Sequence, residues 1–96
     1  VKVDRVWCVA DAGLVVNPDG ARNQLEGGIV QAVSWTLKEQ VRLDAQGIAS
    51  RDWDSYPILR FSEVPTVSVE IMPGGEHPPL GAGEAAQGPT AAALAN

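Results

Sequence analysis

A short turn, Gly81-Ala82-Gly83-Glu84, places two glycines next to a carboxylate. Glycine lets the backbone approach a bulky ligand closely, and a single carboxylate held beside a ligand can act as a general base. The amide groups of such a turn can also bind an anion, but the turn lacks both the Lys-Ser/Thr pair of a phosphate-binding loop and the third glycine of the dinucleotide fingerprint. The structural alternative for Glu84 is a carboxylate in the first turn of a following helix, which the helix dipole favours.

A second unusual segment is Gln24-Leu25-Glu26-Gly27-Gly28. Two adjacent glycines inside a helical pattern cost about 1 kcal/mol each relative to alanine, so another group must approach that face closely. This group is either a neighbouring helix or strand, or a ligand whose polar edge Gln24 hydrogen-bonds through its carbonyl and its amide. The residues alone favour helix packing.

The other candidate residues have simpler explanations. His77 lies in a proline-rich loop and is expected to be solvated, whereas Cys8 is expected to be a small core hydrophobe. The aromatic residues expected to pack in the core or in a loop are Trp35, Trp53, Tyr56 and Phe61. Asp52 and Asp54 lack a third nearby carboxylate, and the chain has neither a CxxC motif nor a histidine pair. We therefore expect no metal ligand from this chain.

The elements that must position these residues follow from periodicity and turn signals. Apolar alternation predicts a strand over 1–10 and another over 66–72. Asn17 and Pro18 predict a helix N-cap and first helical position, and an apolar stripe at helical spacing extends through Glu39. The stripe consists of Leu25, Ile29, Val33 and Leu37.

The remaining segments complete the order of elements. A hairpin is predicted over 40–51, an ordered loop over 53–65 and a proline loop over 73–79. A glycine-rich bend then leads to an alanine-rich helix after Pro89. The order strand, helix, hairpin, strand, helix predicts an α+β fold. Because the last helix has no glycine cap or basic last turn, we expect residues 1–96 to be cut from a longer chain.

Composition narrows the classes of function. The chain has 96 residues, 45% of them hydrophobic and 20% charged, which is typical of one globular domain or part of one. Its net charge of -5 and its lack of a basic run argue against a nucleic-acid partner. Its uncharged stretches are too short for a spanning helix, and its single cysteine leaves the compartment undecided between cytoplasm and periplasm.

Three motifs taken together resemble a known family. They are Asp11-Ala12-Gly13 with Asn17-Pro18, then Gln24 to Gln31, then Gly81 to Glu84 followed by Ala91 to Asn96. In this order they resemble the C-terminal part of the molybdopterin-binding large subunit of the molybdenum hydroxylases, the xanthine dehydrogenase and aldehyde oxidase family. The segments 34–39 and 51–57 look more like the branch of the isoquinoline 1-oxidoreductase β-subunits than the purine-oxidising branch.

The resemblance implies a function and roles for individual residues. Residues 1–96 would be the C-terminal part of a molybdopterin-binding domain in an enzyme that hydroxylates an aldehyde or N-heterocyclic carbon with water-derived oxygen. Glu84 would be the general base toward the Mo-OH group, and Gln24 would hydrogen-bond the molybdenum-molybdopterin cofactor, with Gly81, Ala82 and Gly83 also at the cofactor.

The same resemblance implies partners. These would be the remainder of the large subunit, an iron-sulfur subunit or domain with 2Fe-2S clusters, and a small-molecule substrate. The fragment alone would be inactive and would not retain the cofactor. Two other functions stay open from the residues: a stand-alone module that binds a small ligand or anion, and a structural interaction module.

Overall fold

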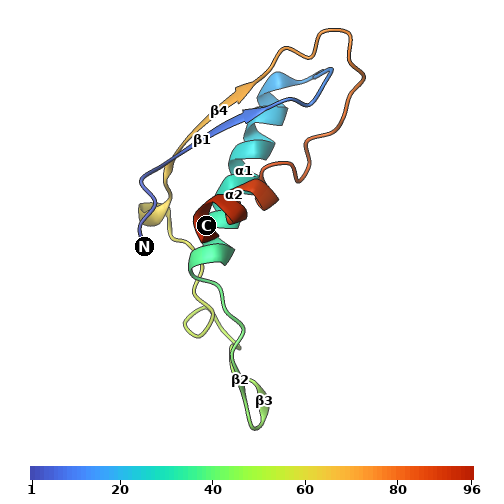
Figure 1. Ribbon diagram of the computed structural model, residues 1–96. Helices are drawn as coiled ribbons and strands as arrows, with labels where there is room; N and C mark the ends of the chain where they lie inside the picture. Colours follow the sequence, from blue (N-terminus) through green and yellow to red (C-terminus); the bar gives the residue numbers. More distant parts are fainter.

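The structure, a computed structural model that describes residues 1–96, is built on two parallel strands (Figure 1). β1 (Arg5–Ala10) pairs with β4 (Thr66–Ile71), with Arg5 opposite Thr66 and Ala10 opposite Ile71. Both strands were predicted, although β1 begins later than the alternation suggested. Because the pairing is parallel, the two strands end at the same edge of the sheet.

The long helix α1 (Pro18–Leu37) starts where the sequence predicted. The Asn17 side chain accepts a hydrogen bond from the Gly20 amide at 2.9 Å, and Pro18 occupies the first turn. At the other end, the amides of Lys38 and Glu39 both donate to the Ser34 carbonyl, at 2.9 and 3.2 Å. The helix therefore closes before Glu39, where the apolar stripe had placed its end.

The core lies between α1 and one face of the parallel sheet. Leu25, Ile29 and Val33, three residues of the predicted stripe, are fully buried. Alternate residues of both strands pack against them: Val6, Cys8, Ala10, Val67, Val69 and Ile71. Cys8 is therefore part of the apolar layer, as expected.

The second helix, α2 (Gln87–Ala95), packs against α1 and begins two positions before Pro89. The sequence placed its start after the proline, but proline is tolerated in a first turn because its missing N–H has no partner there anyway. Ala86 and Thr90 are buried where this helix begins, and the Thr90 hydroxyl donates to the Ala86 carbonyl at 2.6 Å. Helices and sheets together confirm the α+β class.

Residues 40–57 form an arm that extends away from the rest of the molecule, whose extents are 56 × 26 × 24 Å (Figure 1). The arm carries the predicted hairpin, which is limited to β2 (Leu43–Asp44) and β3 (Gly47–Ile48). No second layer covers this hairpin, and two strands without such a layer are marginally stable in water. A 3₁₀ turn, η1 (Phe61–Glu63), follows the arm and leads to β4.

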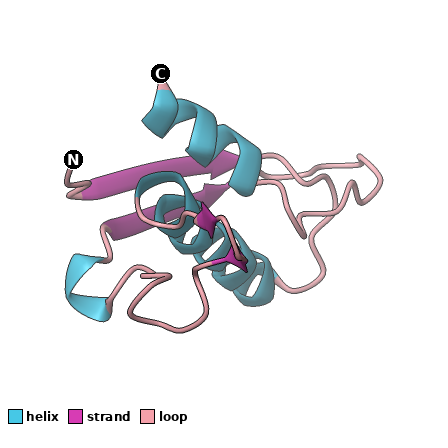
Figure 2. Cartoon of the chain, turned by 90° about the horizontal axis from the view of Figure 1, so that it is seen from below, coloured by secondary structure: helices cyan, strands magenta, loops and turns pink.

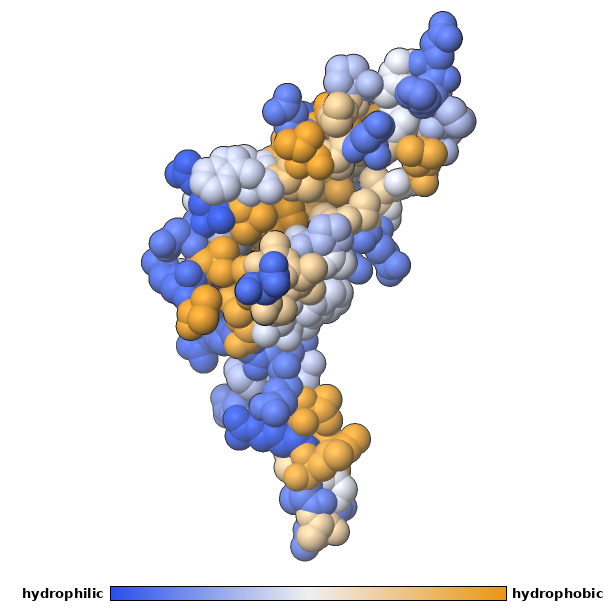
Figure 3. Space-filling view, viewed as in Figure 1, coloured by the Kyte–Doolittle hydropathy of each residue, from blue (hydrophilic) through white to orange (hydrophobic).

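The expectation that the aromatic residues pack inside was mostly wrong. Trp53 and Phe61 have exposed fractions of 75% and 101%, and Trp35 is 38% exposed, whereas Tyr56 is half-buried. The single apolar layer between α1 and the sheet is already filled by aliphatic side chains, and the 53–65 loop runs outside it. Figure 3 shows apolar atoms at the surface of the arm, where Val41, Leu43 and Ile48 are exposed.

Candidate functional site

The candidate site lies where the two parallel strands end. The loop after β1 and the loop after β4 extend together at this end of the molecule (Figures 1 and 2). Two backbone hydrogen bonds join them: the Leu14 amide donates to the His77 carbonyl at 3.1 Å, and the Leu80 amide donates to the Ala12 carbonyl at 2.9 Å. Ligands of α/β sheets characteristically bind beyond the carboxyl ends of the strands.

Two glycines allow these loops to approach each other. Gly13 has φ +65°, and a Cβ at this position would overlap the carbonyl oxygen of Pro78. A Cβ at Gly74 would in turn overlap the Gly13 carbonyl group. The Asp11 carboxylate fixes the same bend by accepting the Gly13 amide at 3.0 Å. Because a side chain at Gly13 or Gly74 would overlap the backbone of the other loop, the close contact between the two loops requires glycine at both positions.

The Gly81 to Glu84 turn follows this pair of loops. Gly81 has φ +83°, which strongly favours glycine, and a Cβ at Gly81 or Gly83 would meet open space. No amide of residues 81–84 donates to an acceptor within the chain. A hollow of about 220 Å³ lies beside the turn, lined partly by Asn17, Gly81 and Ala82. The turn thus offers free N–H donors next to an open volume.

Gln24 connects the long helix to this turn. Its side-chain Nε2 donates to the Gly83 carbonyl oxygen at 2.7 Å, across 59 residues of sequence. Its carbonyl Oε1 has no partner within the chain and remains available as an acceptor. The structure therefore brings together Gln24, the Gly81 to Gly83 backbone and the adjacent Glu84.

Glu84 itself lies just outside α2. Its backbone carbonyl accepts the Gln87 amide at 3.3 Å, and its side chain is exposed without a hydrogen-bond or ion-pair partner in the chain. The first turn of α2 contains no acidic residue. The alternative that placed Glu84 inside the first helical turn is thus wrong, because the helix starts only at Gln87.

The two glycines of α1 have different surroundings. A Cβ at Gly28 would lie 3.5 Å from both the Ala86 Cβ and the Gln87 Cγ, an ordinary van der Waals distance, so the start of α2 packs on this face of α1 without requiring glycine there. A Cβ at Gly27 would have no neighbour within 4 Å. Packing of a neighbouring element, which the sequence favoured, is thus observed at Gly28, but at neither glycine is the approach too close for a Cβ.

Comparison of the sequence with known proteins identifies the family of the chain. The sequence model of the molybdopterin cofactor-binding domain matches residues 1–65. The chain belongs to the molybdopterin cofactor-binding domain family. It is 47% identical, over its whole length, to a subunit of the nicotinate dehydrogenase of Pseudomonas putida. It is 39% identical over 72 residues, 75% of the chain, to the β-subunit of isoquinoline 1-oxidoreductase of Brevundimonas diminuta.

The fold is likewise that of a molybdenum hydroxylase. Quinoline 2-oxidoreductase from Pseudomonas putida 86 superimposes with a TM-score of 0.80 over 98% of the chain, at 27% sequence identity. The chain spans 8% and 9% of the two relatives' lengths and 13% of the quinoline 2-oxidoreductase chain. The family resemblance predicted from the motifs is confirmed, an isoquinoline 1-oxidoreductase β-subunit is among the relatives, and the family is one of molybdenum-dependent oxidoreductases.

The residues of this molybdopterin-binding chain suit a cofactor rich in polar atoms. The free amides of the 81–84 turn can donate to its oxygen or nitrogen atoms, and Gln24 Oε1 can accept from an amino group. Within the chain no three residues among the His, Cys, Asp and Glu side chains form a group that could hold a metal ion. His77 is exposed in its loop, and neither helix combines the length and apolarity that crossing a membrane requires.

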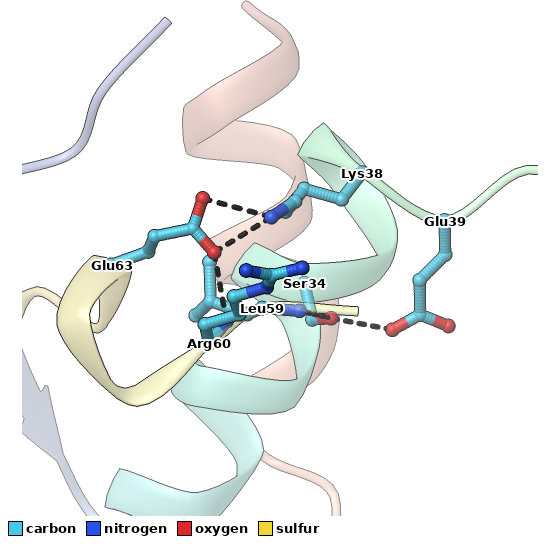
Figure 4. A network of polar contacts seen from close by, with 6 residues as sticks. All are labelled: Ser34, Lys38, Glu39, Leu59, Arg60 and Glu63. Carbon is cyan, nitrogen blue, oxygen red and sulfur yellow. Dashed lines mark hydrogen bonds and ion pairs between the residues drawn. The ribbon is translucent and has the colours of Figure 1, made fainter. Parts of the chain in front are cut away.

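A polar network at the opposite end of α1 was missed by sequence reasoning (Figure 4). Ser34 is 7% exposed, and its hydroxyl donates to the Glu39 carboxylate at 2.6 Å while accepting the Leu59 amide at 2.9 Å. The Tyr56 hydroxyl donates to the same carboxylate at 2.8 Å, which raises the pKa of Tyr56 above its usual range. Ser34 thereby joins the helix to the loop that follows the arm.

A second contact in this network involves Lys38 and Glu63. The Lys38 Nζ donates to both carboxylate oxygens of Glu63, at 2.8 and 2.6 Å, and the Arg60 amide donates to the same carboxylate at 2.8 Å. The hydrogen bond from Lys38, followed by that from the Arg60 backbone, holds the pKa of Glu63 below its usual range. A serine within an amphipathic helix carries no sequence signal that would have revealed these distant partners.

Proposed function

We propose that this chain is the C-terminal part of the large subunit of a molybdenum hydroxylase that acts on an aldehyde or an N-heterocyclic aromatic compound. Family membership supports the redox class, and the names of the relatives concern nicotinate, isoquinoline and quinoline, which are N-heterocycles. The rest of the large subunit and an iron-sulfur subunit or domain would complete the enzyme. The isolated chain would then retain no molybdenum and show no hydroxylase activity.

The observation that carries this proposal is the hydrogen bond from Gln24 to Gly83. This bond joins the helix that bears Gln24 to the turn that bears Glu84, and this proximity supports the proposal. In the proposed enzyme, Gln24 Oε1 and the amides of Gly81, Ala82 and Gly83 hold the edge of the molybdopterin cofactor. Their donors and acceptor are unpaired within the chain, so cofactor binding would displace no internal hydrogen bond.

Glu84 is proposed as the general base. When bound, the molybdenum cofactor supplies the site that delivers water-derived oxygen and accepts two electrons from the substrate. The Glu84 carboxylate accepts the proton that this chemistry releases. Its side chain has no partner to compete for that proton, and the flanking Gly83 leaves room for a ligand beside it. A positioned general base contributes about 10²- to 10⁴-fold to the rate.

The test is Glu84→Gln in the full-length enzyme, because glutamine keeps the shape but loses the ability to accept the proton. The rate of reduction by substrate, expressed per bound molybdenum, should fall about 10²- to 10⁴-fold. Glu76→Gln, at an exposed loop carboxylate on the same end of the molecule, is the matched control and should leave the rate unchanged. A Glu84→Gln enzyme that loads molybdenum and is reduced at the parent rate would refute the assignment.

Gln24 provides a separate test of the cofactor site. Gln24→Ala leaves a polar edge of the cofactor unpaired and also removes the bond to Gly83, at a cost of about 1 to 3 kcal/mol. Molybdenum content should therefore fall more than turnover per molybdenum. Metal analysis of the purified variant measures its molybdenum content. Unchanged molybdenum content would mean that Gln24 only joins the helix to the turn.

A second candidate, anion binding by the isolated chain, is favoured by one observation, the free amides of residues 81–84. Calorimetry with inorganic phosphate on the 96-residue chain separates the two proposals. Saturable binding without the rest of the enzyme would support the stand-alone module. Absence of binding is the result expected for a cofactor site that needs further segments.

A further inference from the structure

Three residues of α1 contact the segment that carries Glu84, and they share one helix face. Gln24, Gly28 and Gln31 are spaced at i, i+4 and i+7, so they lie in one row along the helix. Gln24 binds the Gly83 carbonyl, Gly28 accommodates Ala86 and Gln87, and the Gln31 Oε1 accepts a hydrogen bond from Gln87 Nε2 at 2.9 Å. We call these three residues the α1 clamp.

From this row we infer that the α1 clamp positions Glu84, with Gln31 and Gln87 as positioning residues that touch neither substrate nor cofactor. This inference rests on the proposed function of Glu84 as the base. Nothing in the sequence motifs singled out the Gln31 and Gln87 pair, which are separated by 56 residues.

The Glu84 side chain is not held by any contact of its own. It has no partner in the chain, and the residue stands in a turn whose amides are free. The Glu84 backbone carbonyl accepts the Gln87 amide, and the flanking backbone is held at the Gly83 carbonyl before it and at Ala86 and Gln87 after it. The direction of the carboxylate therefore depends on the clamp at both ends of a short span.

Catalysis is sensitive to this kind of positioning. A general base must reach its proton at hydrogen-bond distance, and a displacement of about 1 Å can lower a rate by about 10²-fold. Buried Ala86 contributes a steric anchor after Glu84. The Gln31 to Gln87 bond is the polar anchor, and it can be removed without touching the turn itself.

The facing side-chain amides of Gln31 and Gln87 allow an experiment in which only the double substitution removes their hydrogen bond. If either glutamine becomes a glutamate, the remaining amide can turn so that its NH₂ group donates to the new carboxylate. Gln31→Glu and Gln87→Glu should therefore each preserve the bond. The double variant places two carboxylates against each other with no donor, so only this variant breaks the polar anchor.

In the full-length enzyme, the two single variants should retain kcat per molybdenum within about 2-fold, since a hydrogen bond remains. The double variant should lower kcat about 10- to 100-fold at unchanged KM and unchanged molybdenum content. Within residues 83–87 the Gln87 amide donates to the Glu84 carbonyl, and its hydrogen exchange should accelerate about 3- to 10-fold in the double variant only. Adding the double change to Glu84→Gln should cause no further loss, because the base is already absent.

A matched control adds the same charge elsewhere. Gln40→Glu with Gln46→Glu places two new carboxylates on the arm, and this pair should change neither kcat nor exchange at 83–87. Parent-like exchange or parent-like kcat in the Gln31 and Gln87 double variant would overturn the clamp. A Glu84→Gln enzyme that keeps the parent rate, with the α1 clamp unchanged, would instead refute the proposed role of Glu84 as the base.

Discussion

The two ends of α1 are attached to their surroundings by different means. At its N-terminal end, the loops are joined mainly by backbone hydrogen bonds and by glycines that allow direct main-chain contact. At its C-terminal end, the loop after the arm is held by side chains that include the carboxylates of Glu39 and Glu63. The end that carries the candidate site is thus fixed mainly by main-chain contacts, and the end that carries the arm by side chains that include titratable carboxylates.

The strongest test of this contrast is Gly13→Ala. The new Cβ would overlap the Pro78 carbonyl in a left-handed backbone conformation, so unfolding free energy should fall by about 2 to 5 kcal/mol. Gly47→Ala is the control, because Gly47 has φ +117° but no neighbour within 4 Å. Urea unfolding of both variants compares the two positions. Equal losses would mean that the contact between the loops contributes nothing beyond the backbone conformation.

An intermediate effect is expected for Ser34→Ala. This change leaves the Leu59 amide without its acceptor and the Glu39 carboxylate without one donor, so the expected loss is about 1 to 3 kcal/mol. Protease cleavage within residues 40–60 should become faster while the site end stays protected. Ser62→Ala, at an exposed serine in η1, should leave both regions unchanged. Loosening of the site end by Ser34→Ala would remove the distinction between the two ends.

The smallest effect concerns pH. The pKa of Glu63 is lowered by Lys38 and by the Arg60 amide, so its contribution is present above the unfolded carboxyl pKa of about 4.3 and is lost as pH falls through the lower folded value. Hydrogen exchange across residues 58–64 should therefore accelerate below about pH 4. In Lys38→Met this acid dependence should weaken. Exchange of the Leu80 amide, which donates to the Ala12 backbone carbonyl, should show no matching change, and a parallel change there would contradict the comparison.

Local sequence signals predicted most of the fold. The Asn17 cap, the Pro18 start and the buried stripe of α1 depend on contacts within a few residues, and β4 alternates cleanly because one of its faces is exposed. The end of α1 was misplaced because Lys38 and Glu39 close onto Ser34, which hydrophobic spacing does not encode. The aromatic residues were misassigned because hydrophobicity alone does not say whether a core has room for them.

The candidate site could be predicted in part. The motifs pointed to Gln24 and to the Gly81 to Glu84 turn, and the structure joins them by one hydrogen bond. The partner of that bond could not be predicted, because a glutamine side chain carries no signal for a carbonyl 59 residues away. The Gln31 to Gln87 pair was missed for the same reason. Parallel pairing of β1 with β4 is what brings these distant segments into reach.

That pairing also has a consequence for synthesis on the ribosome. Arg5 meets Thr66, so β1 leaves the ribosome long before its hydrogen-bonding partner exists. At about 5 to 20 residues per second, the nascent strand waits roughly 3 to 12 seconds with the edge that pairs with β4 still unpaired. Trp7 and Val9, still 70% and 65% exposed in the folded chain, would keep that waiting strand attractive to chaperones. Slowed translation between codons 11 and 65 should therefore lower the soluble yield, whereas slowing after β4 has emerged from the ribosome should have little effect.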